Sequence, residues 1–155
     1  MNNNQRGHAM IELAACAGLM VACLAGAFQF GYTFYVYNQL VSAVGNGARY
    51  ASGRTYRAAS PKDVERGNEV IRNMVVYGDP HPDANSRPVV PDLKPDEIQV
   101  KWNFATTGNT SAPESVDISI LHHQVNAIFG TFNFSGRPAF EFPYLGRYAP
   151  SESEK

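Results

Sequence analysis

Residues 13–37 read LAACAGLMVACLAGAFQFGYTFYVY, and only Gln29 and Thr33 among them are clearly polar. At about 1.5 Å rise per residue, a helix over this stretch is longer than the ~30 Å hydrocarbon core of a bilayer. No charged side chain occurs between Glu12 and Arg49. We therefore predict a transmembrane helix over residues 8–37.

Two alternatives to a retained helix compete for the same stretch. A cleaved secretory signal would use the small residues Ala25–Ala27 as its processing site, but the apolar run continues through Phe28–Tyr37. A lipoprotein would be acylated at Cys16 or Cys23, yet membrane-like sequence rather than a polar tether follows each cysteine. The retained helix fits best.

Small residues recur along this helix at every fourth position, at Ala14, Gly18, Ala22 and Gly26. Such a stripe lets two membrane helices approach closely where no hydrophobic force drives them together. The plainer interpretation is that alanine and glycine are common in membrane helices. We predict that the stripe packs against another helix.

Composition separates an anchor from a water-facing domain. The 155 residues include 13 basic and 14 acidic side chains, for a net charge of −1, which is no indication of nucleic-acid binding. Almost all of these charges follow residue 48. The two cysteines, Cys16 and Cys23, are roughly 10 Å apart along a helix at about 1.5 Å per residue, too far for a disulfide bond, and we interpret both as packing residues.

The helical pattern continues beyond the membrane. Tyr32, Tyr35 and Tyr37 are typical of an aromatic belt at a membrane surface. Apolar residues then recur at helical spacing, at Leu40, Val41, Val44 and Ala48. Gly45 and Gly47 each weaken a helix by about 1 kcal/mol relative to alanine, so the helix either bends here or is supported by neighbours. We predict a stalk helix over residues 38–52, and one long helix over residues 9–52.

A second helix is indicated after residue 60. Ser60 suits the N-cap, Pro61 the first turn, Asp63 the positive end of the dipole and Gly78 the stop. Its predicted apolar face consists of Val64, Val70, Ile71, Met74 and Val75. The following stretch, up to Pro95, is too proline-rich for regular structure.

Apolar residues alternate with polar ones further along the chain. This period of two predicts strands over residues 98–104 and 116–120, and a less clear third strand over residues 139–144. Helices followed by antiparallel strands predict an α+β fold, with a small sheet packed on the soluble half of the long helix. The α+β domain spans residues 53–150 in this prediction, and residues 151–155 form a disordered tail.

No catalytic or metal-binding group set emerges. His122 and His123 would point to opposite faces of a strand, and His81 lies in the proline-rich loop, so we interpret them as surface histidines. Asp79, Asp83 and Asp92 do not have the spacing of a calcium loop. Neither a serine elbow nor a phosphate loop is present in the sequence. We expect no enzymatic activity and no cofactor.

Several motifs resemble the TadE-like family of pilus-biogenesis proteins. They are RGHAMIELA at residues 6–14, Phe30-Gly31, YVYNQL at residues 35–40 and GARYA at residues 47–51, and they cover about the first third of the chain. The resemblance implies a pilin-like fold and a role as a minor pilin or pseudopilin of a tight-adherence pilus.

The resemblance also implies roles for residues at the N-terminus. Residues 1–7 would be a leader, and a prepilin peptidase would cut between Gly7 and His8. Glu12 would serve processing and assembly. Many relatives carry an acid just before the Phe-Gly pair, where this chain has Gln29, so the role of that second charge is not carried over.

The partners that the resemblance implies are other pilin-like subunits, the prepilin peptidase, the inner-membrane assembly platform and membrane lipid, without nucleic acid. The location is the bacterial inner membrane, with a single span and a periplasmic C-terminal domain. More basic residues follow the span (Arg49, Arg54, Arg57, Lys62) than precede it (Arg6), which argues against this orientation unless the long domain overrides the count.

A second functional class stays open. The protein would then be a membrane-anchored surface-binding module or tip adhesin, with its binding surface on the loop Asp79–Pro95 or on the aromatics of Phe129–Tyr148.

Overall fold

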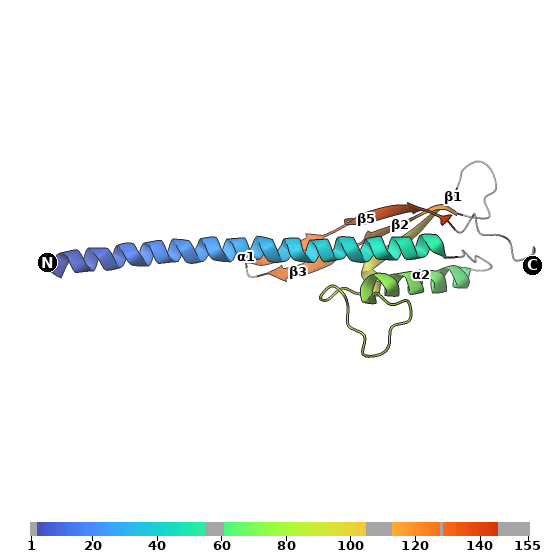
Figure 1. Cartoon of the computed structure of the whole chain (residues 1–155), viewed down its shortest axis with the longest axis horizontal. Helices are drawn as coiled ribbons and strands as arrows, with labels where there is room; N and C mark the ends of the chain where they lie inside the picture. The colour runs from blue at the N-terminus through green and yellow to red at the C-terminus, as the bar shows by residue number, and fades with distance from the viewer. Residues whose placement is uncertain (1–2, 55–60, 105–112, 128, 146–155) are drawn as a thin grey trace, which may run out of the picture.

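The computed structural model describes residues 3–54, 61–104, 113–127 and 129–145. One long helix, α1 (Asn3–Gly53), runs through the molecule, and all other elements lie against its C-terminal half (Figure 1). The helix contains no proline, and it begins at Asn3 rather than at the predicted residue 9. The predicted α+β fold, with a long N-terminal helix and small antiparallel sheets, is confirmed.

The second helix, α2 (Pro61–Tyr77), ends where the sequence predicts. Gly78 has a φ of 72° and donates its N–H to the carbonyl of Met74 at 3.1 Å, which closes the last turn. Ser60, the predicted cap, lies outside the described residues. The residues buried on α2 are Asn68, Ile71, Val75 and Val76.

Gly47 lets the two helices approach closely. A Cβ atom at this position would lie 2.2 Å from Cγ2 of Val75 on α2. Val75 is β-branched and fully buried, so its side chain has little freedom to move aside. At Gly45, by contrast, an added Cβ would meet nothing within 4 Å. The helix therefore gains support from a neighbour at Gly47.

Three strands form the main antiparallel sheet in the order β1-β2-β5: β1 (Ile98–Phe104), β2 (Pro113–Ile120) and β5 (Ala139–Pro143). Ile118 in the central strand pairs with Val100 on one side and Phe140 on the other. All three predicted strands are confirmed, although β2 begins at Pro113. Phe104 departs from the predicted half-buried face, because the register shifts after Asn103 and leaves Phe104 43% exposed. A short 3₁₀ turn, η1 (Pro95–Glu97), leads into β1.

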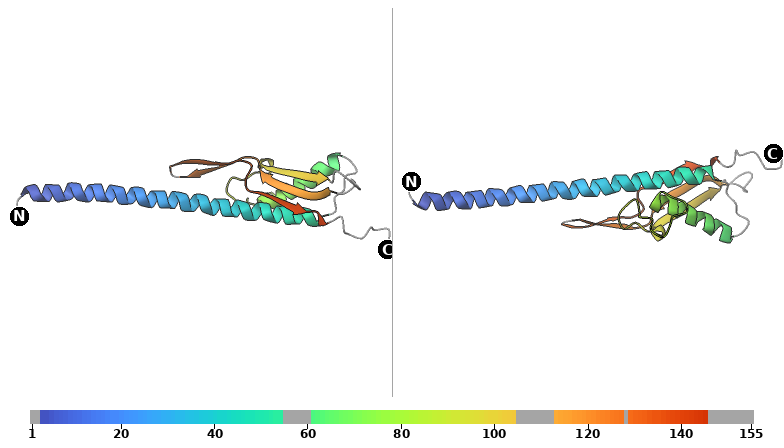
Figure 2. Two further views of the ribbon diagram at one scale, coloured as in Figure 1. Left: turned by 90° about the horizontal axis from the view of Figure 1, so that it is seen from above. Right: turned by 60° about the horizontal axis from the view of Figure 1, so that its bottom comes forward.

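A second, two-stranded sheet was not predicted. Strands β3 (His123–Ala127) and β4 (Gly130–Phe134) form an antiparallel hairpin. The hairpin extends from the domain along α1 toward the N-terminal half of that helix (Figure 2).

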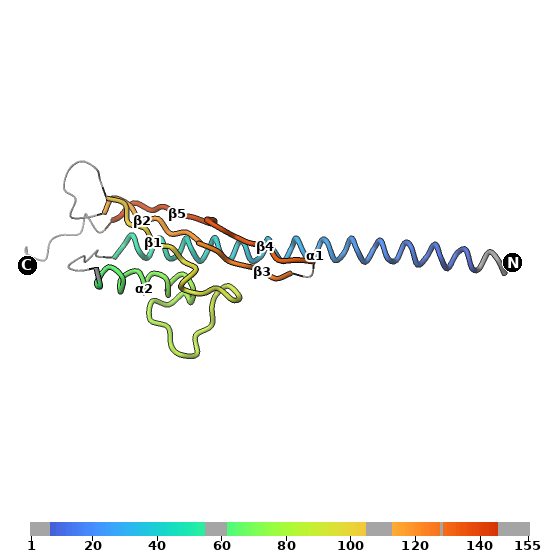
Figure 3. Tube along the Cα trace, turned by 180° about the vertical axis from the view of Figure 1, so that it is seen from behind, coloured from blue at the N-terminus to red at the C-terminus, as the bar shows by residue number. Residues whose placement is uncertain are grey.

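The hydrophobic core lies where α1, α2 and the sheet meet. Its fully buried members include Leu40, Val44, Ala48, Val75, Val90, Val116, Ile118 and Ile120. Leu40, Val44 and Ala48 belong to the predicted apolar face of the stalk, which is thereby confirmed. The view from behind shows that no other element covers the N-terminal half of α1 (Figure 3).

Candidate functional site

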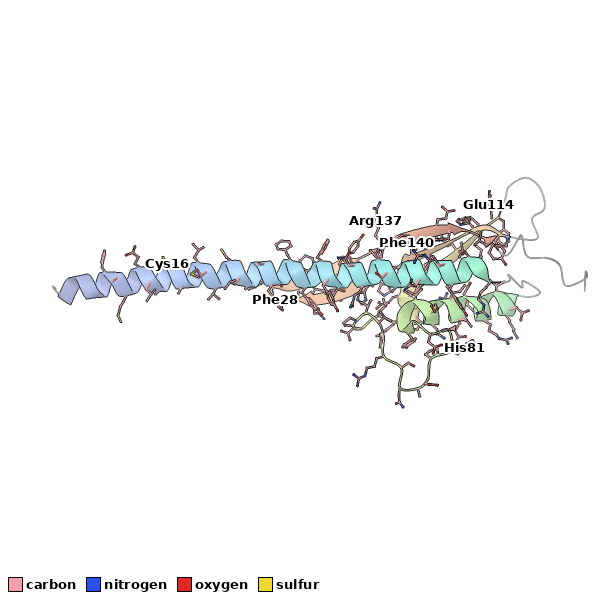
Figure 4. All side chains as sticks on the ribbon, viewed as in Figure 1. Cys16, Phe28, His81, Glu114, Arg137 and Phe140 are labelled. Atoms are coloured by element: carbon pink, nitrogen blue, oxygen red, sulfur yellow. The ribbon has the colours of Figure 1, made fainter. Side chains whose placement is uncertain are left out.

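Residues 7–24, in the N-terminal half of α1, form an apolar helix that no other described part of the chain covers. Every residue from Gly7 to Leu24 is exposed, and the side chains along this part project outward on all sides (Figure 4). The large exposed apolar residues are Met10, Ile11, Leu13, Leu19, Met20, Val21, Leu24 and Phe28. A water-soluble surface rarely carries so large an apolar area. The helix is long and apolar enough to cross a bilayer, and it fits a single-span membrane anchor.

Glu12 is the one charged residue of α1 between Gly7 and Ala48. It is exposed, roughly 7.5 Å along the helix axis from Gly7 at about 1.5 Å per residue. His8 lies four residues earlier, on the same face of α1. A carboxylate next to hydrocarbon is costly unless a partner neutralises it. The predicted processing residues, Gly7 and His8, are thus in one helical segment with the predicted assembly residue.

Among the described residues, little packs against the small-residue stripe. An added Cβ at Gly18 or Gly26 would meet nothing within 4 Å. Ala14 and Ala22 are exposed as well. Cys16 (labelled in Figure 4) and Cys23 are exposed free thiols on the same part of the helix. Ala14, Gly18 and Ala22 are therefore exposed and Gly26 is half-buried, and packing of the stripe against another helix stays a prediction.

Gln29 marks the point where the domain begins to cover α1. Its side chain is only 6% exposed, and its Oε1 accepts a hydrogen bond from the backbone N–H of Phe129 at 3.0 Å. Phe129 lies at the turn between β3 and β4. This hydrogen bond joins the hairpin turn to the helix.

The hairpin also contacts α1 one to two turns later. The rings of Tyr37 and Phe134 are 5.6 Å apart, and Tyr32 packs against the hydrophobic core. Of the three tyrosines in the predicted aromatic belt, only Tyr35 is largely exposed. The hairpin thus lies beside part of the stretch assigned to the membrane from sequence, residues 29–37.

The prediction of a surface histidine at position 123 is wrong. His123 is 2% exposed, and its Nδ1 lies 2.8 Å from Oε2 of Glu97. The Nε2 atom is buried without a hydrogen-bond partner in the described part of the chain. The pair joins the start of β3 to the end of η1, whereas the neighbouring His122 is exposed as predicted.

The described residues contain no group of three His, Cys, Asp or Glu side chains close enough to hold a metal ion. Several aromatics of the alternative binding surface serve the core instead. Phe134, Phe140 and Phe142 pack against it, and Tyr144 is buried. Phe129 is different, because it is 66% exposed at the hairpin turn.

The helix α1 is the part of the chain that matches a known protein family. Residues 7–49 match the family model described as TadE-like protein. We call residues 7–49 the TadE-like segment, because they are similar to that family. The match agrees with the resemblance found in the sequence motifs. Comparison with curated proteins and with solved structures finds no match.

The TadE-like segment has two parts with different surroundings. From Gly7 to Leu24 every residue is exposed, and this part holds Glu12 and three of the four stripe residues, whereas Gly26 is half-buried and Phe28 lines a groove with β3. From Gln29 to Arg49 it forms one wall of the core and includes Gly47, where α2 packs against it. The segment thus combines an anchor with a support for the rest of the fold.

Proposed function

We propose that this protein is a minor pilin or pseudopilin that takes part in assembly of a thin tight-adherence pilus. It is anchored in the bacterial inner membrane, and its C-terminal domain lies in the periplasm. The observation that carries the proposal is the free apolar half of the TadE-like segment, with Glu12 as the one carboxylate at its edge. The role is structural and involves no catalysis.

The charge on Glu12 has a natural partner after processing. A cut between Gly7 and His8 creates an α-ammonium group on His8. In a bundle of such helices, Glu12 of one chain pairs with the ammonium group of a neighbour. Removing one partner of a buried ion pair costs about 3–5 kcal/mol, so the pair fixes the register of the helices as well as holding them together.

The small-residue stripe complements this ion pair. Because Gly18 and Gly26 leave open space around the backbone, a neighbouring helix can pack closely at that face. The partners of this protein are accordingly other pilin-like subunits, together with the prepilin peptidase and the inner-membrane assembly platform.

A charge-removing variant tests the role of Glu12. In a bacterium that lacks its own copy of the protein, we would express the wild type, Glu12→Gln and Glu69→Gln. Glu69 is an exposed carboxylate on α2, which makes it the matched control. We expect Glu12→Gln to enter the membrane in normal amounts and to reduce the pili recovered by shearing, while Glu69→Gln behaves like the wild type. Normal piliation with Glu12→Gln would refute the assembly role.

The proposed cut is tested by the mass of the intact membrane form. A processed chain lacks residues 1–7, and its net charge changes from −1 to −2, because Arg6 is lost (12 basic against 14 acidic residues). We expect the mass of a chain that starts at His8. A chain that starts at Met1 rules out processing.

A further inference from the structure

The free part of α1 has a length that matches a bilayer. The fully exposed stretch Gly7–Leu24 extends roughly 27 Å at about 1.5 Å per residue, and at Phe28 the helix has extended roughly 33 Å, compared with ~30 Å for a hydrocarbon core. If the membrane span begins at Leu13, the first residue after Glu12, the about 20 residues that are needed to cross a bilayer end near Tyr32. Both counts put the membrane surface level with residues 28–32.

The turn of the β3–β4 hairpin lies at this same level. The backbone N–H of Phe129 is bonded to the Gln29 side chain, and β3 residues Asn126 and Ala127 line a groove with Phe28 and Tyr32. The groove has a volume of about 380 Å³ and is mostly apolar. The hairpin turn and the helix therefore reach the membrane surface side by side.

The composition of the hairpin suits a lipid environment. No side chain is charged between His123 and Arg137. At the turn, Phe129 is 66% exposed, and Phe132 on β4 is 36% exposed. Large aromatic side chains at a loop tip without charges favour the layer where lipid headgroups meet the acyl chains.

We propose that the β3–β4 hairpin turn is a second membrane contact, which inserts Phe129 into the interfacial layer of the phospholipid bilayer beside α1. The groove between Phe28, Tyr32 and the hairpin holds part of a lipid acyl chain. This contact goes beyond the role in pilus assembly, because it requires only that α1 spans a bilayer, whichever side the domain faces.

Two features limit the depth of the contact. A two-stranded hairpin has backbone groups along its edges that need water or another partner, and hydrocarbon offers neither. Insertion therefore stops at the turn. The Oε1 atom of Gln29, at the same depth, accepts the hydrogen bond from Phe129, which lowers the cost of placing this polar atom there.

Fluorescence of a single tryptophan in the full chain tests the proposal. In a Trp102→Phe background we would introduce Phe129→Trp and reconstitute the protein in phosphatidylcholine–phosphatidylglycerol vesicles. These vesicles carry bromine either near the glycerol backbone or near the chain ends. Phe132→Trp is a second probe on the same hairpin. Leu145→Trp, exposed beyond the end of β5, is the matched control, and circular dichroism verifies that each variant is folded.

We expect emission at position 129 to shift to shorter wavelength and to lose most of its intensity with the shallow bromine label, but little with the deep one. Position 132 should show a weaker loss of the same kind, and position 145 none. Emission at long wavelength that aqueous iodide quenches would show that the turn stands in water, which overturns the proposal. A short-wavelength emission that bromine does not quench would assign the turn to a contact with another chain, and it overturns the proposal too.

The assembly proposal and this one fail separately. Quenching at position 129 is measured with one protein in vesicles, in which no pilus machinery is present. Equal quenching at positions 129 and 145 would mean that the whole domain lies on the membrane, and it would refute a contact confined to the turn.

Discussion

Gly45 and Gly47 lie two residues apart in α1 and have opposite surroundings. An added Cβ at Gly47 would collide with Val75, whereas at Gly45 it would meet nothing within 4 Å. We expect Gly47→Ala to lower the free energy of unfolding by about 1–3 kcal/mol through overpacking. Gly45→Ala should raise the free energy of unfolding by about 0.4–1 kcal/mol, because alanine favours the helix and restricts the unfolded chain.

Thermal unfolding of the full chain in detergent, followed by circular dichroism, measures both glycine variants. Each serves as the control for the other, since the same atoms are added in the same helix. Equal shifts in Tm for the two variants would contradict the close approach of α1 and α2 at Gly47.

The Glu97–His123 pair is a second feature at the scale of single residues. Glu97→Ala would leave Nδ1 of the buried His123 without its partner, at a cost of about 1–3 kcal/mol. Glu97→Gln retains an acceptor oxygen and should cost less. The control is Glu114→Ala, which alters an exposed side chain on the same sheet.

Chemical denaturation of the three carboxylate variants provides the measurement. We expect the midpoint to fall most for Glu97→Ala, less for Glu97→Gln, and hardly at all for Glu114→Ala. If Glu97→Ala and Glu114→Ala have the same midpoint, the pair does not stabilise the fold.

At the scale of elements, the turn of the β3–β4 hairpin is joined to α1 by the hydrogen bond between Phe129 and Gln29. Gln29→Leu removes the acceptor for the N–H of Phe129. The free energy needed to open the turn away from α1 should then fall by about 1–3 kcal/mol. Hydrogen exchange should then become faster at the turn and stay unchanged in the sheet β1-β2-β5. Gln39→Leu is the control, because Gln39 bonds to Tyr35 within the same helix. Unchanged exchange at the turn of Gln29→Leu would show that other contacts hold the hairpin.

Elements with a strong local pattern could be predicted from the sequence. The period of 3.6 in α1 and α2, the glycine stop at Gly78 and the alternation in β1 are properties of short segments. Each strand of the hairpin has only five residues, which is too short to show a clear alternation of apolar and polar residues. Its turn is held by a contact between residues 29 and 129, which no local pattern reveals. The burial of His123 was missed for the same reason.

The candidate site was predictable in a different way. Glu12 is conspicuous as a charge next to an apolar run, and the small-residue stripe is conspicuous by its spacing of four residues; the family match includes both. Gln29, by contrast, stands out in the sequence only as a polar break in the apolar run. Its function in the fold required the position of Phe129, and the sequence provides no means to place it there.

At the scale of the whole molecule, the free helix makes a prediction about association. Gly18→Leu adds a large side chain to the small-residue stripe, where the chain itself has no contact. We expect the domain to keep its Tm, and energy transfer between labelled copies in a bilayer to decrease, because helices can no longer approach closely. Leu19→Ala, on a different face of the helix, is the control and should retain association. Unaltered energy transfer with Gly18→Leu would exclude the stripe as a contact.

The unbroken course of α1 has a mechanical consequence. The helix has 51 residues without proline, and it passes from its bare end into the core without a hinge between them. Because α2 and the sheet are packed directly on α1, a force that acts on the domain along the helix axis also displaces the exposed apolar end of the helix. Raising the domain by one helical turn, about 5.4 Å, withdraws one turn of apolar side chains from the bilayer. Any protein that pulls on the domain therefore works against the hydrophobic free energy that holds the anchor in the bilayer.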